Sequence, residues 1–189
     1  MKLGILAIQG DFAAHAKAFA EAGADVMEAR TAADLATADA LVLPGGESTT
    51  MLKLLREEGL WEPLRAACST KPVFATCAGA ILLAKRVSNP EQDSLGLVDI
   101  DVERNAYGRQ VYSTVVKLAL ESGEPMEAVF IRAPIIRRTG SAVRVLARYE
   151  NDPVLVEQDR ILIATFHPEL TRDRGLQRLF LEKASHVPA

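Results

Sequence analysis

The chain has 189 residues, of which 49% are hydrophobic and 25% charged, a balance typical of one soluble globular domain. Lys and Arg number 22 against 25 Asp and Glu, and the net charge of −3 argues against a polyanion such as nucleic acid as partner. The apolar start, residues 1–8, is too short for a signal peptide or a membrane span. We therefore expect a cytoplasmic protein without a membrane contact.

The first half of the chain alternates between strand-like and helix-like segments, a pattern that predicts βαβ units and a mostly parallel sheet. The expected strands are Leu3–Ile8, Val26–Glu28, Ala40–Leu43 and Val73–Ala75. The expected helices run from Asp11 to Gly23, from Ser48 or Thr49 through Arg56, over Trp61–Cys68 and over Ala80–Lys85.

After Asn89-Pro90 the pattern changes to strands with few helices between them. The expected strands are Leu97–Val102, Val111–Leu120, Val129–Ile131, Val143–Tyr149, Val154–Val156 and Ile161–Phe166, followed by a closing helix over Arg174–Ala184. No repeat or linker separates the halves. We predict a single α/β domain over residues 1–189, with three α/β/α layers, a mostly parallel central sheet and a more antiparallel second half.

Cys77 follows the apolar run Val73–Ala75 and precedes good helix formers. Small residues on both sides allow a tight strand-to-helix turn that exposes the side chain, as in a nucleophile elbow. The N-terminus of the next helix favours a thiolate. In a cytosolic setting Cys68 and Cys77 are expected to stay reduced, and a disulfide between them is the minor alternative.

A thiolate nucleophile needs a group that accepts and donates protons near neutral pH, and the chain has three histidines. His186 lies near the C-terminus, and for His15, inside the first helix, we expect a surface or packing role. His167 follows the last strand and opens His-Pro-Glu. Pro168 disfavours the helical region for His167, so the tripeptide is expected to be extended or a turn. In an extended segment the Glu169 carboxylate points to the same side as the imidazole. A solvated loop is the alternative for these three residues alone.

Leu43–Thr50 reads Leu-Pro-Gly-Gly-Glu-Ser-Thr-Thr. Two glycines after a strand let the backbone approach a ligand, and the helix that follows offers free N–H groups. The N–H groups of Gly46 and Ala78 would then form an oxyanion hole, the alternative being a plain tight turn. The segment lacks P-loop spacing, so no nucleotide site is predicted.

Together these residues give the chain a resemblance to class I glutamine amidotransferases, which carry a Cys–His–Glu triad, and within them to the glutaminase subunits of two-component pyridoxal 5′-phosphate synthases. The resemblance extends from Leu3 to Leu181. Its family-specific stretches are LPGGESTT at Leu43–Thr50, VERNAYGRQ at Val102–Gln110, FIRAP at Phe130–Pro134 and FHPELT at Phe166–Thr171. The family elbow has Gly two residues before the cysteine, where this chain has Ala75, so a positive φ there would bring strain.

The resemblance implies Cys77 as nucleophile, His167 as acid and base, and Glu169 as the residue that orients His167. It further implies that L-glutamine is held by six residues: Gly46, Glu47, Ser48, Arg104, Ile131 and Arg132. The product ammonia would go to a (β/α)8-barrel synthase subunit in a large hetero-oligomeric assembly, for vitamin B6 biosynthesis. No cofactor and no metal are expected. The alternatives are a glutaminase for another pathway and a non-catalytic binding module of the same fold.

Overall fold

The computed structural model describes residues 1–105 and 114–186. Its helices are α1 (Phe12–Glu21), α2 (Ala32–Thr37), α3 (Ser48–Glu57), α4 (Trp61–Thr70), α5 (Ala78–Leu83) and α6 (Gly175–Ser185), with a 3₁₀ turn, η1, over Pro168–Leu170. Its strands are β1 (Lys2–Leu6), β2 (Asp25–Ala29), β3 (Ala40–Leu43), β4 (Val73–Thr76), β5 (Ala84–Ser88), β6 (Val98–Glu103), β7 (Thr114–Ala119), β8 (Pro125–Phe130), β9 (Ile135–Thr139), β10 (Arg144–Tyr149), β11 (Asp152–Gln158) and β12 (Ile161–Ala164).

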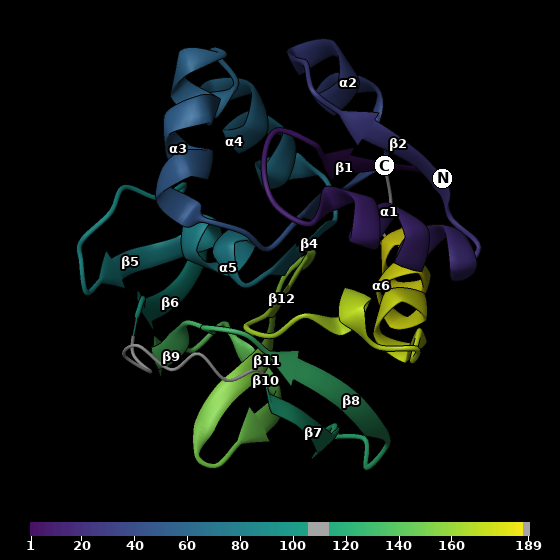
Figure 1. Ribbon diagram of the computed structural model, residues 1–189, viewed down its shortest axis with the longest axis vertical. Helices are drawn as coiled ribbons and strands as arrows, with labels where there is room; N and C mark the ends of the chain where they lie inside the picture. The colour runs from purple at the N-terminus through teal and green to yellow at the C-terminus, as the bar shows by residue number, and fades with distance from the viewer. Residues whose placement is uncertain (106–113, 187–189) are drawn as a thin grey trace.

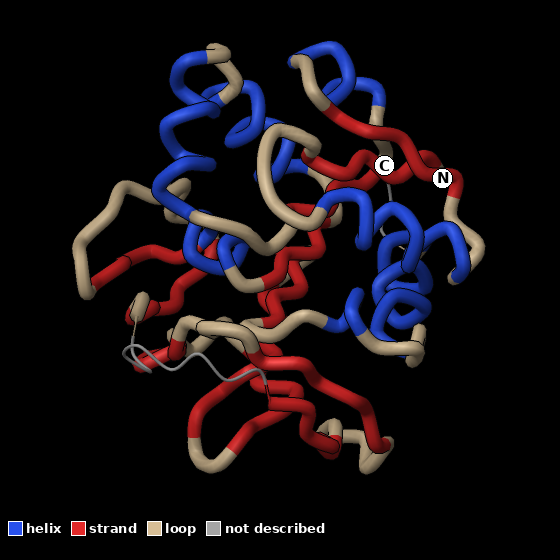
Figure 2. The backbone as a smooth tube through the Cα atoms, viewed as in Figure 1, coloured by secondary structure: helices blue, strands red, loops and turns tan. Residues whose placement is uncertain are grey.

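A seven-stranded sheet in the order β10-β11-β12-β4-β3-β1-β2 forms the middle of the molecule (Figures 1 and 2). Its four pairings from β12 to β2 are parallel, and the two that join β10, β11 and β12 are antiparallel. Two smaller sheets, β5-β6-β9 and β7-β8, are built from strands within residues 84–139. The predicted fold class, a mostly parallel α/β sheet with a more antiparallel second half, is confirmed.

The two faces of the large sheet build separate cores because successive side chains of a strand point to opposite sides. Phe74 and Leu162 pack with Phe19 of α1 and Phe180 of α6 on one face. On the other face, neighbouring residues of the same strands pack against helices α2 to α5. The helices that cover the sheet on its two sides are seen in Figure 1.

Four elements differ from the sequence prediction, and one of them is strand β5, which was not predicted. The helix expected to reach Lys85 ends at Leu83, because Ala84 already pairs with Val98 as β5 joins β6. Strand β9 was not predicted; it pairs antiparallel with β6. Helix α2 was also missed, although Thr31 and Asp34 form a capping box at its start.

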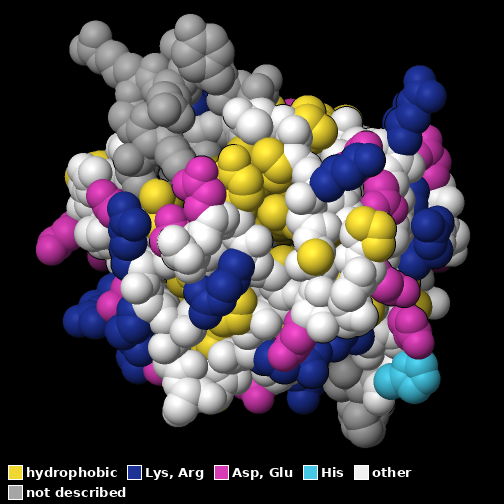
Figure 3. All heavy atoms as spheres, turned by 90° about the horizontal axis from the view of Figure 1, so that it is seen from below, with side chains coloured by type: hydrophobic (Ala, Val, Ile, Leu, Met, Phe, Trp, Pro, Cys, Tyr) yellow, Lys and Arg dark blue, Asp and Glu magenta, His cyan; other side chains and the backbone are white. Residues whose placement is uncertain are grey.

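Some predicted segments reach beyond the described residues. The family-specific stretch Val102–Gln110 and the expected strand Val111–Leu120 both overlap residues 106–113, so only their described parts, in β6 and β7, are compared. Within the described ranges, every helix is too short or too polar to cross a membrane. Basic and acidic side chains are interspersed on the face shown in Figure 3.

Candidate active site

Cys77 occupies the turn between β4 and α5 with a backbone conformation that is rare for any residue but glycine. Its φ is 44° and its ψ −99°, and its N–H donates to the Ala164 carbonyl at 3.0 Å. Such a backbone costs about 1–3 kcal/mol and persists only where the surroundings impose it. The backbone strain that a positive φ would cause at Ala75 is absent, because Ala75 lies within β4 and pairs with Leu43 and Ile163. The strained residue of the elbow is the cysteine itself.

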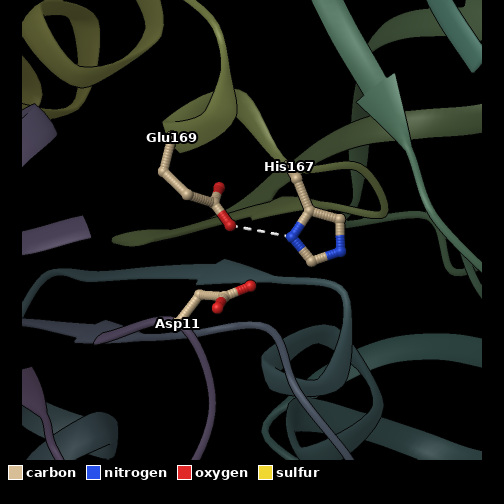
Figure 4. A group of neighbouring side chains, drawn as sticks. All are labelled: Asp11, His167 and Glu169. Atoms are coloured by element: carbon tan, nitrogen blue, oxygen red, sulfur yellow. Dashed lines mark hydrogen bonds and ion pairs between the residues drawn. The ribbon is translucent and has the colours of Figure 1, made fainter. Parts of the chain in front are cut away.

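His167 reaches the same edge of the sheet because β12 runs parallel to β4, with Ala164 opposite Thr76. Its backbone N–H donates to the Val129 carbonyl at 2.8 Å, which ties the segment to β8. Its Nδ1 lies 2.7 Å from Oε1 of Glu169 (Figure 4). The contact is the expected one, and of the two expected backbone courses, extended or turn, the structure has the turn: residues 168–170 form the 3₁₀ turn η1, which carries Glu169.

The three side chains are electrostatically coupled. Burial opposes the charge of His167, but hydrogen bonds with Cys77 and Glu169 outweigh it and raise the pKa of His167 to about 10. Burial likewise opposes ionisation of Glu169, yet hydrogen bonds from His15 and His167 lower its pKa to about 2. At neutral pH the imidazole therefore carries a proton and the carboxylate is ionised. Cys68, in contrast, is an inert thiol, since burial raises its pKa to about 12, and both cysteines are free.

His15 also belongs to this network of side chains, and the sequence patterns did not predict its contact with Glu169. Its side chain is fully buried rather than at the surface, and its ring stacks on Phe19, as a packing role requires. Its Nε2, however, lies 3.0 Å from Thr76 Oγ1 and 3.3 Å from Glu169 Oε1. A histidine inside an apolar helix face gave no sequence signal for this contact. His186 lies beyond α6, where its Nδ1 is 2.7 Å from the Glu182 carbonyl oxygen, outside the pocket that holds Cys77.

A pocket of about 200 Å³ opens beside Cys77 and His167. All six residues expected to hold glutamine line it: Gly46, Glu47, Ser48, Arg104, Ile131 and Arg132. Besides Cys77 and His167, the lining includes four residues that the sequence patterns did not indicate: Asp11, Ile81, Asn105 and Pro134. Two larger hollows, of about 500 and 640 Å³, flank α6 and contain neither Cys77 nor His167.

Neighbouring side chains leave no room for a Cβ atom at Gly45 or Gly46. A Cβ at Gly45 would overlap the imidazole of His167, and Gly46 has a φ of 152° beside the side chain of Gln9. The Glu47 N–H donates to Oε1 of Gln9 at 3.1 Å, which fixes the course of this turn. Ala78 is the first residue of α5, where a backbone N–H has no partner within the helix.

The polar residues of the pocket have partners that set their positions. Glu47 caps α3 by accepting from the N–H groups of Thr49 at 3.1 Å and Thr50 at 2.6 Å. Burial opposes its ionisation, but these bonds and the Thr50 hydroxyl lower the pKa of Glu47 to about 2. Arg104 Nη2 donates to Thr49 Oγ1 at 2.8 Å and lies 3.6 Å from Glu47 Oε1. The pocket thus presents a cation and an anion side by side.

Asp11, His167 and Glu169 form a group whose potential metal-ligand atoms lie within 4.8 Å of one another (Figure 4). The Nδ1 of His167 is already bonded to Glu169, so the three do not offer a set of free ligands. The exposed Asp11 adds a second carboxylate beside the histidine.

Cys77, His167 and the buried Glu169 thus lie together at the carboxyl edge of the parallel part of the sheet. A solved structure described as a glutamine amidotransferase is 47% identical, with a TM-score of 0.90, and the match covers 97% of this chain and 98% of that one. Residues 5–186 match the model of the SNO glutamine amidotransferase family. The chain belongs to this family.

Its curated relatives carry a common name. A pyridoxal 5′-phosphate synthase subunit PdxT of Solibacter usitatus is 56% identical over 96% of this chain and 98% of its own length. A protein of the same name from Thermotoga neapolitana is 49% identical over the same shares of the two chains. The resemblance inferred from the motifs is confirmed, and so is the class of enzyme, a glutamine amidotransferase.

Proposed function

We propose that this chain hydrolyses L-glutamine to L-glutamate and ammonia, with Cys77 as nucleophile, His167 as acid and base, and Glu169 as the residue that orients His167. The observation that carries the proposal is that Cys77 and His167 line one pocket, while Nδ1 of His167 lies 2.7 Å from Oε1 of the buried Glu169. The function rests on one domain over residues 1–189.

In the first step the Cys77 thiolate attacks the carboxamide carbon of glutamine. The oxyanion that forms is held by the N–H groups of Gly46 and Ala78. The proton on His167 passes to the amide nitrogen, the C–N bond breaks, and ammonia leaves from a γ-glutamyl thioester on Cys77.

In the second step water attacks the thioester. The thiolate that helped to raise the pKa of His167 has been consumed, so the imidazole now has a lower pKa and accepts a proton from water. The C–S bond then breaks, glutamate leaves, and the thiolate forms again. One histidine serves as acid and then as base because its neighbour changes charge between the steps.

Glutamine recognition needs a cation or amide donors for the α-carboxylate and an anion for the ammonium group. Arg104 and Arg132 supply positive charge and Glu47 supplies negative charge, while Gly46, Ser48 and Ile131 complete the wall. The low pKa of Glu47 keeps its carboxylate ionised at neutral pH.

The relatives' name supports a further part of the proposal: the ammonia is delivered to a separate synthase subunit for pyridoxal 5′-phosphate (vitamin B6) biosynthesis. Following the family resemblance, that subunit is a (β/α)8 barrel, the assembly is a large hetero-oligomer in the cytoplasm, and the chain uses no cofactor or metal of its own.

The test is ammonia release from glutamine by the chain mixed with its synthase subunit, comparing wild type with Cys77→Ala. Loss of at least about 1,000-fold is expected, because no other group supplies the nucleophile. Cys68→Ala, a matched change in the other cysteine, should retain activity. Activity retained by Cys77→Ala would refute the mechanism, and an inactive wild type would favour the non-catalytic module. Ammonia transfer to a synthase of another pathway would instead favour that pathway.

A further inference from the structure

We propose that His15 is a positioning residue for this reaction: its imidazole donates the Nε2 hydrogen to the Glu169 carboxylate and holds that carboxylate in place behind His167. The inference rests on the proposed function of the Cys77, His167 and Glu169 series. It extends that series by one residue, which lies far away in sequence on α1.

The location of His15 makes it an internal support rather than a substrate contact. The side chain is fully buried, it is absent from the lining of the pocket, and its ring packs beside those of Phe19 and Phe74 at centroid distances of 6.5 and 6.2 Å. Helix α1 packs against η1, the turn that carries Glu169. A polar side chain in such apolar surroundings is costly unless its hydrogen bonds are made.

The contacts identify the tautomer. Nε2 faces two oxygens, Thr76 Oγ1 at 3.0 Å and Glu169 Oε1 at 3.3 Å, whereas Nδ1 has no hydrogen-bond partner in the described part of the chain. A hydrogen on Nδ1 would be a buried donor without an acceptor, and it would leave the Nε2 lone pair against an ionised carboxylate. A hydrogen on Nε2 avoids both costs. Of the two tautomers, the contacts therefore favour the one with its hydrogen on Nε2.

His15 thereby connects the two arms of the site. Thr76 immediately precedes Cys77 at the end of β4, and Glu169 follows His167 by two residues. Oε1 of Glu169 lies 2.7 Å from Nδ1 of His167 and also faces Nε2 of His15. Oε2 of Glu169 has no hydrogen-bond partner within the described residues. Without His15, the buried carboxylate would depend on His167 alone, and its ionised form would be less stable.

The charged groups around Glu169 determine the direction of the pH effect. His167 and His15 face its carboxylate directly, and Asp11 lies in the same group within 4.8 Å. Removal of the His15 donor makes Glu169 easier to protonate, and a protonated Glu169 no longer stabilises the imidazolium of His167. The acid limb of the activity profile should then move to higher pH.

The main variant is His15→Phe, which keeps an aromatic ring beside Phe19 and Phe74 and removes the donor. In the complex with the synthase subunit, we expect kcat for glutamine hydrolysis to fall about 10- to 100-fold, the range for loss of a hydrogen bond to a charged group. KM should change less than about threefold, since His15 does not touch the pocket, and the acid limb should move upward. His15→Gln, which retains an N–H donor, should recover part of kcat. Phe19→Leu, a core change on the same helix without a polar group, is the matched control and should leave the pH profile unshifted.

Two further measurements keep the inference testable if His15→Phe folds poorly. In wild type, the ¹⁵N chemical shifts of His15 should show a protonated Nε2 and an unprotonated Nδ1; the opposite tautomer would overturn the proposal. The second measurement is the pH dependence of Cys77 alkylation by iodoacetamide, with Cys77→Ala as the blank: its acid limb should lie at higher pH in His15→Gln than in wild type, and an unshifted limb would contradict the proposal.

The outcomes separate this inference from the proposed function. Wild type that releases no ammonia while Cys77 still reacts with iodoacetamide contradicts the proposed function and not the position of His15. An active wild type whose His15→Phe variant matches Phe19→Leu in kcat and pH profile contradicts the role of His15 alone. If Glu169→Gln is already present, adding His15→Phe should cost less than threefold more, because the two residues act through one another.

Discussion

Two networks of charged side chains lie in different surroundings in this molecule. Glu169 lies between two histidines with its side chain fully buried. On the sheet β5-β6-β9, Asp101 accepts from Arg86 at 2.6 Å and from Arg138 at 3.0 Å, but the two arginine side chains are 71% and 39% exposed. Both carboxylates have a pKa lowered to about 2.

The same lowered pKa has different consequences in the two places. Around Asp101, water and salt screen the charges, and exposed ion pairs contribute about 0–1 kcal/mol to stability. Around Glu169 there is little water to replace a lost partner, so removal of one member leaves another buried and unsatisfied. Because the network around Glu169 is buried, we expect the loss of one of its members to affect both chemistry and stability more than a loss around Asp101. The number of ion pairs does not determine this difference.

The largest expected effect comes from Glu169→Gln. We expect kcat for glutamine hydrolysis in the complex to fall at least about 100-fold, because the imidazolium of His167 loses its buried counter-charge and its orientation. Asp101→Asn is the same type of change in the exposed network and should alter kcat less than twofold. Equal losses in the two variants would mean that burial does not distinguish the networks.

The next effect is on stability as a function of pH. Glu169 has a folded pKa near 2, below the 4.5 of an ordinary glutamate, so its contribution is present above about pH 4.5 and is lost as the pH falls towards 2. The gap in unfolding free energy between wild type and Glu169→Gln should therefore narrow over that range. Chemical denaturation at a series of pH values measures it, and a gap that is constant from pH 5 to pH 2.5 would show that the charge of Glu169 does not stabilise the fold.

The smallest effect belongs to Asp101→Asn at neutral pH. We expect a loss of at most about 1 kcal/mol, most of it abolished by 1 M salt, because the arginines around Asp101 are open to solvent. Urea unfolding at low and high salt is sufficient to measure it. A loss that persists in 1 M salt would mean that Asp101 contributes to stability like the buried Glu169 and not like a member of an exposed ion pair.

The sequence was most informative where local chemistry and topology agree. The alternation of strands and helices predicts the parallel half, and the motifs around Cys77 and His167 place both residues at the ends of neighbouring strands. The parallel pairing of β4 and β12 then brings together residues that are 90 positions apart in the chain.

Other features depend on contacts that local patterns do not encode. The end of α5 at Leu83 is set by pairing with β6, against the helix propensity of Ala84 and Lys85. The polar role of His15 requires α1 to pack over η1, and a histidine on an apolar helix face is equally consistent with packing alone. For α2 a local signal did exist, since Thr31 and Asp34 have the spacing of a capping box.

Cys77 has a positive φ, which is unfavourable for the backbone of a cysteine, while the proposed reaction requires the cysteine side chain at this position. Every folded copy of the protein bears the cost of that backbone, whether or not glutamine is bound, because the strands on either side hold the turn. A glycine would adopt the same turn without strain, but it would provide no nucleophile. Under the proposed function, the backbone of this turn favours glycine while the reaction requires cysteine, so that selection for stability and selection for activity act there in opposite directions.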